Sequence, residues 1–274
     1  MVTIGADPEL FIVNSKTNDV VSSIGLIPGV KNDPYEPEGY PHGFGIETDN
    51  ILAEFNIPPA SDPDSFVDNI IEMQDYIRNF VKKVNPDYDI QCIASRLVSR
   101  TQLRSKEAKM FGCDPDFNAW TEQQNPKLEG AATNLRSAGF HVHIGYAGNN
   151  VNTSLEIIKH LDMYLGIPSV LIDPDKERRK LYGKAGCFRL QPWGVEYRVL
   201  SSYMMSNPEL IRFVYNNALM AVDYVLHGAK IDIPNANIDI PNIINNSDVE
   251  KAKTFCMKYN IRLPKSINLV NLNK

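Results

Sequence analysis

The sequence predicts an α+β fold in which a mainly antiparallel sheet packs against helices. Short apolar segments typical of strands and longer segments with helical periodicity follow one another in no regular strand–helix–strand order. This irregular order favours antiparallel pairing, because parallel neighbours need a long crossover connection, usually a helix. No glycine-rich loop has either standard phosphate-binding spacing, so a nucleotide would have to be held in another way.

Length and composition are those of an ordinary globular enzyme. The chain has 274 residues, of which 43% are hydrophobic and 22% charged, and its net charge is −5. The acidic balance argues against a nucleic-acid partner, although a local basic site for a small phosphate ligand stays open. No secretory signal or apolar stretch of membrane-spanning length is present, and the four cysteines are widely spaced. We therefore expect a cytoplasmic protein with free thiols and no membrane partner.

The first elements are predicted to form a hairpin followed by a long loop. Residues 2–13 have the pattern of a strand interrupted by Asp7-Pro8-Glu9, residues 14–19 that of a turn, and residues 20–24 that of a returning strand. Residues 28–45 are dense in proline and glycine, which predicts an ordered loop or one that becomes ordered around a ligand.

A strand and an amphipathic helix are predicted next. Residues 51–57 have strand composition, and residues 64–84 carry apolar side chains at three- and four-residue spacing. Asp62 or Asp64 is expected near the helix start, and residues 89–99 are predicted to form another strand.

The rest of the chain is predicted to be a series of short elements and a tail. In order, these are a polar segment at 111–130, a strand at 139–146, a helix at 152–166, a basic loop at 175–189, a strand at 194–203 and a helix at 207–227. We expect a catalytic domain over residues 1–228, and a C-terminal tail over 229–274, rich in Asn, Ile and Pro, that packs on the same domain, if only loosely.

Four polar pairs interrupt otherwise apolar strand segments. Side chains two apart share one face of a strand, so each pair points to one side of the sheet. The pairs are Asp7 with Glu9, Glu54 with Asn56, His141 with His143, and Glu196 with Arg198. Taken singly, each has a structural interpretation: a turn, a solvent-facing residue, a hydrogen-bonded core pair or an exposed ion pair. Four pairs on separate strands together favour a polar cavity.

Such a cluster predicts a divalent cation site. Carboxylates that are brought together repel one another unless a cation neutralises them, and sets rich in oxygen suit Mg²⁺ or Mn²⁺ better than Zn²⁺. The basic segment adds guanidinium and ammonium groups that match phosphate or carboxylate oxygens, although it also fits a solvated charged turn. Its members are Lys176, Arg178, Arg179, Lys180, Lys184 and Arg189.

The order of these motifs resembles that of glutamine synthetase and glutamate–cysteine ligase. Longer strings are similar to the phage-encoded amidoligase family, the carboxylate–amine ligases of type 2, over about residues 1–225. The strings are Gly5-Ala6-Asp7-Pro8-Glu9-Leu10-Phe11, Asp49-Asn50-Ile51-Leu52-Ala53-Glu54-Phe55-Asn56-Ile57-Pro58-Pro59-Ala60, Phe111-Gly112-Cys113-Asp114-Pro115-Asp116-Phe117-Asn118-Ala119-Trp120, Arg178-Arg179-Lys180-Leu181-Tyr182-Gly183-Lys184-Ala185-Gly186 and Gly194-Val195-Glu196-Tyr197-Arg198.

The resemblance implies a glutamine synthetase-like fold, with a curved antiparallel sheet lining the active site and helices behind it. It also implies ATP, two or more Mg²⁺ ions (or Mn²⁺), and an acyl-phosphate that an amine attacks to give an amide. The implied metal ligands are Asp7, Glu9, Glu54, His141 and Glu196. The implied nucleotide contacts are His143, Arg179, Lys180, Lys184 and Arg198, and the implied catalytic residues are Arg198, Arg179, Arg189 and Glu54.

Several points stay open at this stage. Either Glu47 or Asp49 fits as the acidic partner of Glu54, and Asp114 and Asp116 have no counterpart in glutamine synthetase. The acid and amine substrates, small molecules or peptides, cannot be separated, and a homo-oligomer is possible in this superfamily. Two alternative functions remain: a phosphotransferase of the guanidino-kinase type on the same fold, and a metal-dependent hydrolase that uses the His-x-His pair. A third alternative is a module that binds without catalysis.

Overall fold

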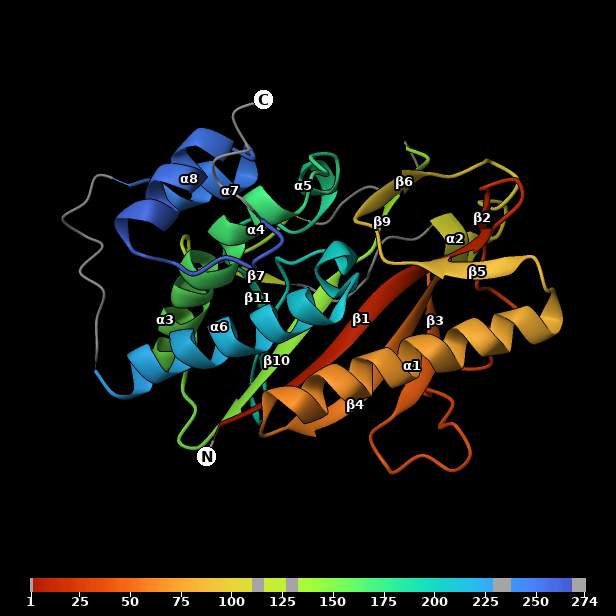
Figure 1. The fold of residues 1–274 in the computed structure, drawn as a ribbon, viewed down its shortest axis with the longest axis horizontal. Coiled ribbons are helices and arrows are strands. Elements are labelled where there is room, and N and C mark those ends of the chain that lie inside the picture. The colour runs from red at the N-terminus through yellow and green to blue at the C-terminus, as the bar shows by residue number, and fades with distance from the viewer. Residues whose placement is uncertain (1, 110–115, 127–132, 229–237, 268–274) are drawn as a thin grey trace.

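A computed structural model describes residues 2–109, 116–126, 133–228 and 238–267. The described chain is a mixed α/β structure built on a large antiparallel sheet of ten strands, as the sequence predicts (Figure 1). The glutamine synthetase-like form of this fold, which the resemblance implies, stays an expectation. No helix among the described residues is long and apolar enough to cross a membrane. The described cysteines Cys92, Cys187 and Cys256 are free thiols.

The sheet is centred on one long strand, β1 (Val2–Asn14). Its main path runs in the order β3-β4-β1-β10-β12-β11-β7-β8, while β2 and β5 pair with the C-terminal half of β1. The other strands of this sheet are β2 (Val20–Val21), β3 (Gly45–Asp49), β4 (Leu52–Ala60), β5 (Tyr88–Gln91), β7 (Phe117–Asn118), β8 (Gln123–Gln124), β10 (Phe140–Tyr146), β11 (Cys187–Gln191) and β12 (Gly194–Tyr197).

The predicted interruption of the first strand is wrong, because β1 continues through Asp7-Pro8-Glu9. Pro8 lies opposite Phe140 of β10, and Glu9 lies opposite Glu54 of β4. The amide of Glu9 also donates to the carbonyl of Gly139 at 2.9 Å. Pairing on both sides keeps the segment extended and outweighs the turn preference of an isolated Asp-Pro dipeptide.

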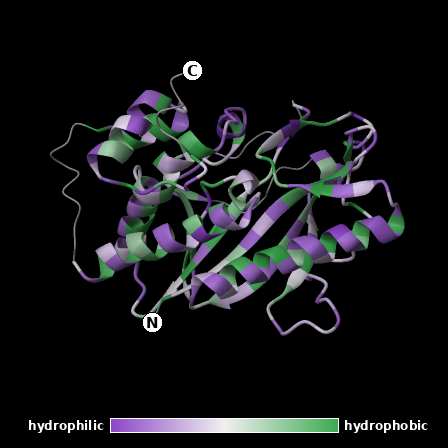
Figure 2. Ribbon diagram, in the orientation of Figure 1, coloured by the Kyte–Doolittle hydropathy of each residue, from purple (hydrophilic) through white to green (hydrophobic). Residues whose placement is uncertain are grey.

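Helices cover one face of the sheet and bury its apolar side chains (Figure 1). The helix α1 (Pro63–Val84) begins at the N-cap Asp62, whose side chain accepts from the amide of Ser65 at 2.8 Å. Its apolar stripe is buried and its opposite face is hydrophilic, as the alternating colours in Figure 2 show. The helix α6 (Pro208–Leu226) is built in the same way and packs beside α1.

The third helix is longer than predicted and is interrupted by a π-helical turn. It consists of α3 (Val151–Leu161), the turn Asp162–Gly166 and α4 (Ile167–Ile172). Pro168 does not end the helix, because it occupies the first turn of α4, where an amide donor is not needed.

Three other segments differ from their predicted form. Residues 45–49, for which no strand was predicted, form β3 at the end of the predicted 28–45 loop. Residues 89–99 break into β5 and the separate strand β6 (Ser95–Leu97), which pairs with β9 (Leu135–Ser137). The basic segment is not a single loop but contains α5 (Arg178–Leu181) before β11. The described part of the C-terminal tail forms α7 (Ile240–Asn245) and α8 (Val249–Lys258), which pack against α4.

Candidate active site

The face of the sheet away from the helices carries most of the predicted site residues. On β10, Phe140, Val142 and Ile144 enter the core, whereas the two histidines between them point to the other side. Antiparallel register then places Asp7 opposite His141, and Glu9 opposite Glu54. Side chains that are far apart in sequence therefore meet on one surface, because cross-strand partners share a face.

One acidic set lies where β1, β10 and β12 meet. Ligand atoms of Asp7, His141 and Glu196 all lie within 4.8 Å of one another. The Nδ1 atom of His141 is 3.4 Å from Oδ1 of Asp7 and 3.7 Å from Oε1 of Glu196. His141 and Glu196 are buried, and Asp7 is nearly so.

A second acidic set lies beside it, where β1, β3 and β4 meet. Carboxylate oxygens of Glu9, Asp49 and Glu54 also lie within 4.8 Å of one another. The Oε2 atom of Glu9 accepts a hydrogen bond from the amide of Gly139 at 2.5 Å, which fixes this carboxyl at the boundary between the two sets. Asp49 belongs to this set, and Glu47, which is on the same strand and buried, lies directly opposite Glu54.

Burial and mutual repulsion raise the pKa values of the second set. Burial is the main cause for Glu54, whose pKa lies well above 4.5, and the carboxyls of Asp7, Asp49, Glu9 and Glu47 add to the shift. Burial also raises the pKa of Glu9. For Glu47, burial together with Asp49 raises the pKa to about 7. These carboxyls are strongly disfavoured as anions when no cation accompanies them.

In the first set, the pKa values of the two carboxyls are instead lowered. Burial alone would raise the pKa of Asp7, but the charges of His143 and His141 outweigh burial and hold it below the usual range. Burial and Asp7 would likewise raise the pKa of Glu196, but the charges of Arg198, His141 and His143 together outweigh them and lower it. Both carboxyls are therefore anionic at neutral pH and available as ligands.

The donor chemistry of both sets fits divalent cations. Carboxylate oxygens with one imidazole nitrogen are the ligands that Mg²⁺ and Mn²⁺ accept. Oδ1 of Asp7 and Nε2 of His143 are buried and 3.0 Å apart, yet neither has a hydrogen bond of normal geometry within the described residues. A bound cation would supply the partner that the buried oxygen of Asp7 lacks.

Arginine side chains border the acidic sets. The guanidinium of Arg198 binds Glu196, and its Nη1 lies 3.3 Å from Nδ1 of His141. On the neighbouring strand, Nη1 of Arg189 lies 3.8 Å from Oε1 of Glu196. Oδ2 of Asp116 is 4.0 Å from Nε of Arg198, which brings this residue to the site, whereas Asp114 lies outside the described residues.

A pocket opens between the acidic sets and the basic segment. Its lining combines three members of the acidic sets, Glu9, Asp49 and His141, with groups from other elements. The remaining lining residues are Asn50, Leu52, Asp116, Arg136, Ser137, Arg178, Tyr182, Gly183 and Arg198. Arg178 is buried there and donates to the carbonyls of Ala138 at 3.2 Å and Val199 at 3.0 Å.

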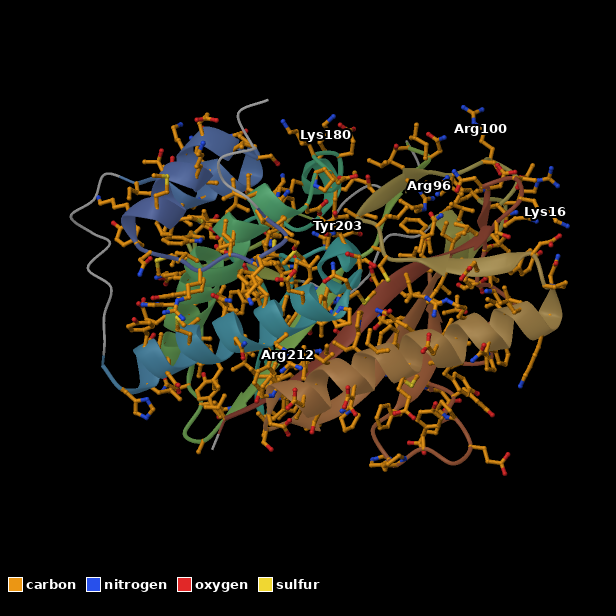
Figure 3. The ribbon with its side chains drawn as sticks, in the orientation of Figure 1. Lys16, Arg96, Arg100, Lys180, Tyr203 and Arg212 are labelled. Atoms are coloured by element: carbon orange, nitrogen blue, oxygen red, sulfur yellow. The ribbon has the colours of Figure 1, made fainter. Side chains whose placement is uncertain are left out.

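Three members of the basic segment, Arg179, Lys180 and Lys184, do not line this pocket. Nη2 of Arg179 donates to Oγ of Ser169 at 2.8 Å, and its Nη1 is 3.4 Å from Oγ of Ser247, so its side chain joins α4 to the turn before α8. Lys180 projects from the outer edge of α5 and binds Glu177 at 2.6 Å (Figure 3). Lys184 is exposed. The pocket position expected for Arg179 is thus held by its neighbour Arg178.

Some pocket residues carry no recognisable signal in the sequence. Asn50, Tyr182 and Gly183 are in strings used for the family resemblance, but Arg136 and Ser137 belong to no such string. Nε of Arg136 donates to Oδ1 of Asn50 at 3.1 Å, a contact between segments 86 residues apart. Only the tertiary fold brings these groups together.

Comparison with known families supports the resemblance. A sequence model of the family described as Phage phiEco32-like COOH.NH2 ligase-type 2 matches residues 128–236. The matched segment includes both histidines, α5, Glu196 and Arg198, but not the carboxylates of β1, β3 and β4. The match therefore supports a relation to the amidoligase family, but it covers less than half of the chain. Among the curated proteins, no relative matches.

Proposed function

We propose that this chain is an ATP- and Mg²⁺-dependent carboxylate–amine ligase that forms an amide bond through an acyl-phosphate. One observation carries the proposal: two acidic sets lie on one sheet face, and members of both, Glu9, Asp49 and His141, line a pocket together with Arg178 and Arg198. Phosphoryl transfer is accelerated by metal ions and guanidinium groups that neutralise charge on the transferring group, and this arrangement offers cation ligands and guanidinium groups together. The family match points to the same reaction class.

The acidic sets are the proposed metal sites. Asp7, His141 and Glu196 would hold one cation, and Glu9, Asp49 and Glu54 a second. Bound Mg²⁺ would neutralise phosphate oxygens and so lower the barrier to attack on the γ-phosphorus. Glu47 lies beside the second set and adds negative charge that strengthens cation binding there.

Arg198 is the proposed residue that stabilises the transferring phosphoryl group. Its guanidinium is largely buried and lies between the first acidic set and Asp116. A planar guanidinium offers two parallel donors to phosphate oxygens, and a fixed donor costs no reorganisation in the transition state. Arg178 holds a positive charge on the other side of the pocket, where it would attract an anionic substrate.

The proposed reaction has two steps. A substrate carboxylate oxygen bonds to the γ-phosphorus of ATP, the bond to the bridging oxygen breaks, and ADP leaves. A neutral amine then bonds to the acyl carbon, the C–O bond breaks, inorganic phosphate leaves, and a carboxylate beside the pocket accepts the proton of the amine. The products are an amide, ADP and phosphate.

The test is ADP release with Mg²⁺ across a panel of carboxylic acids and amines, with amide formation followed by mass spectrometry. ADP release that needs both substrates, together with an amide product, supports the proposal. A phosphorylated product without an amide bond points instead to a phosphotransferase. Hydrolysis that depends on Zn²⁺ but not on ATP points to the hydrolase. Absence of both ATP binding and amide formation with every pair contradicts the ligase.

A further inference from the structure

An exposed tryptophan stands at the end of the polar face. The strands β11 and β12 are joined by the two-residue turn Pro192-Trp193, and the indole of Trp193 is 42% exposed. Its ring centroid lies 5.1 Å from that of His143, with 44° between the ring planes. His143 in turn contacts Asp7 of the first acidic set, so the indole lies close to that set without belonging to it.

The backbone of this turn is held firmly in place. Nδ2 of Asn149 donates to the carbonyl of Pro192 at 2.9 Å, and the amide of Tyr146 donates to the carbonyl of Trp193 at 3.3 Å. Gly194 lets the hairpin lie tight on β10, because a Cβ there would be 2.0 Å from the carbonyl oxygen of Ile144. The exposed indole is therefore a positioned side chain rather than the tip of a loose turn.

The sheet beside the indole is lined by small residues. Thr3, Gly5 and Gly145 follow Asp7 and His143 on the same face of β1 and β10. Gly145 remains partly exposed, and Oγ1 of Thr3 occupies the space where a Cβ of residue 145 would lie. This low surface, called here the Thr3–Gly145 shelf, extends about 13 Å along β10 from His141, at about 3.3 Å per residue.

We propose that Trp193 stacks against the purine base of the nucleotide, which lies over the Thr3–Gly145 shelf while its phosphates reach the first acidic set. This assignment rests on the proposed function, because it needs a nucleotide whose phosphates approach Asp7, His141 and Glu196. The distance along β10 is comparable to the length of an extended nucleoside triphosphate. An indole face is a good partner for an aromatic base, and Oγ1 of Thr3 is a polar group within the same shelf.

Calorimetric titrations with two probes test the assignment. ATP–Mg²⁺ and tripolyphosphate–Mg²⁺ carry the same chain of phosphates, but only ATP carries a base. For Trp193→Leu we expect the Kd of ATP to rise about tenfold while the Kd of tripolyphosphate stays within a factor of about two. Trp193→Phe keeps an aromatic face and should retain most of the ATP affinity.

A matched control is available on the same hairpin. Leu190 is 46% exposed and lies opposite Val195 on the other face of the sheet. Leu190→Ala should leave both Kd values unchanged. Unchanged ATP binding in Trp193→Leu overturns the assignment of Trp193, as does an equal loss of both probes. Equal affinity of the unaltered protein for both probes also overturns it but leaves the ligase proposal standing. If the unaltered protein binds neither probe, both proposals fail.

Discussion

Replacing Glu54 with glutamine should stabilise the protein in the absence of divalent cations while abolishing turnover. Glu54 is buried and lies in the second acidic set together with Glu9 and Asp49. Glutamine keeps the size of the side chain and removes its charge. The carboxyl thus opposes folding when no cation is present, and it becomes useful only when a cation is bound.

The size of the effect can be bounded in two ways. Two ionised carboxylates whose oxygens lie within 4.8 Å of one another repel by at least roughly 3.5 kcal/mol at an effective dielectric constant of about 20. If Glu54 takes up a proton instead, protonating a group with an ordinary pKa of 4.5 at pH 7 costs about 3.4 kcal/mol. Relaxation of the surrounding structure reduces both figures, so Glu54→Gln should raise the free energy of unfolding by about 1–3 kcal/mol. Each kcal/mol corresponds to about 2–4 °C in Tm.

The direction of the pH dependence follows from the raised pKa. Above pH 4.5 the folded protein holds a proton at Glu54 that the unfolded chain has lost, so stability falls as the pH rises. Without divalent cations, the variant should show a shallower fall in stability between pH 5 and 8 than the unaltered protein. Chemical denaturation at several pH values measures this difference.

The matched control is Glu156→Gln, because Glu156 lies on α3 and is about half exposed. This control should change neither stability nor turnover. Added Mg²⁺ should raise the Tm of the unaltered protein and of the control much more than that of Glu54→Gln. The reasoning is refuted if Glu54→Gln is less stable than the unaltered protein without cations, or if it keeps both the Mg²⁺ response and normal turnover.

Three further substitutions test other parts of the protein. Arg198→Lys keeps the charge but loses the planar fork, so kcat should fall about 100-fold with little change in Tm; unchanged kcat removes Arg198 from phosphoryl transfer. Gly183→Ala should lower the Tm more than Gly148→Ala. Both glycines have positive φ, but only at residue 183 would a Cβ collide with a neighbour, Nη1 of Arg178 at 1.6 Å. Equal losses of Tm in the two variants contradict this prediction. Burial raises the pKa of Asp162 to about 7, so folded stability falls as the pH rises from about 4 to 7. In Asp162→Asn, the fall in the free energy of unfolding between pH 5 and pH 8 should be smaller by about 2 kcal/mol than in the unaltered protein, as measured by chemical denaturation. An equal fall in both proteins means that Asp162 is not its cause.

The two-residue period of strands was enough to predict which side chains share a face. It could not predict register, which decides how the ligands divide into sets. Asp7 joins His141 and Glu196, whereas Glu9 joins Asp49 and Glu54, because β1 pairs with β10 on one side and with β4 on the other. That pairing spans about half the chain and leaves no local trace in the sequence.

The basic segment shows a different limit. When it is treated as a loop, Arg178 and Arg179 are equivalent candidates for the pocket. In the helix α5, neighbouring residues point about 100° apart, so one arginine faces the pocket and the other faces α4. By contrast, the C-terminal helices did have a readable signal, since Asp239 and Asp248 both accept hydrogen bonds as N-caps.

The charge balance of the polar face favours a cation-binding role over a purely structural one. A structural network of ion pairs would be expected to match acidic groups with basic ones, because unpaired buried charges are costly. Among the described residues of this face, six carboxyls gather around two arginines: Asp7, Glu9, Glu47, Asp49, Glu54 and Glu196 with Arg189 and Arg198. Both arginines lie near Glu196, at one end of the cluster. In the second acidic set, the charges of His141 and Arg178 lower the pKa of Glu9 but do not outweigh burial, and every group that shifts the pKa of Glu54 raises it. The apolar face that packs on α1 and α6 supplies the stability that offsets this repulsion. The second acidic set, where basic groups offset least of the negative charge, is therefore the place where a divalent cation would contribute most.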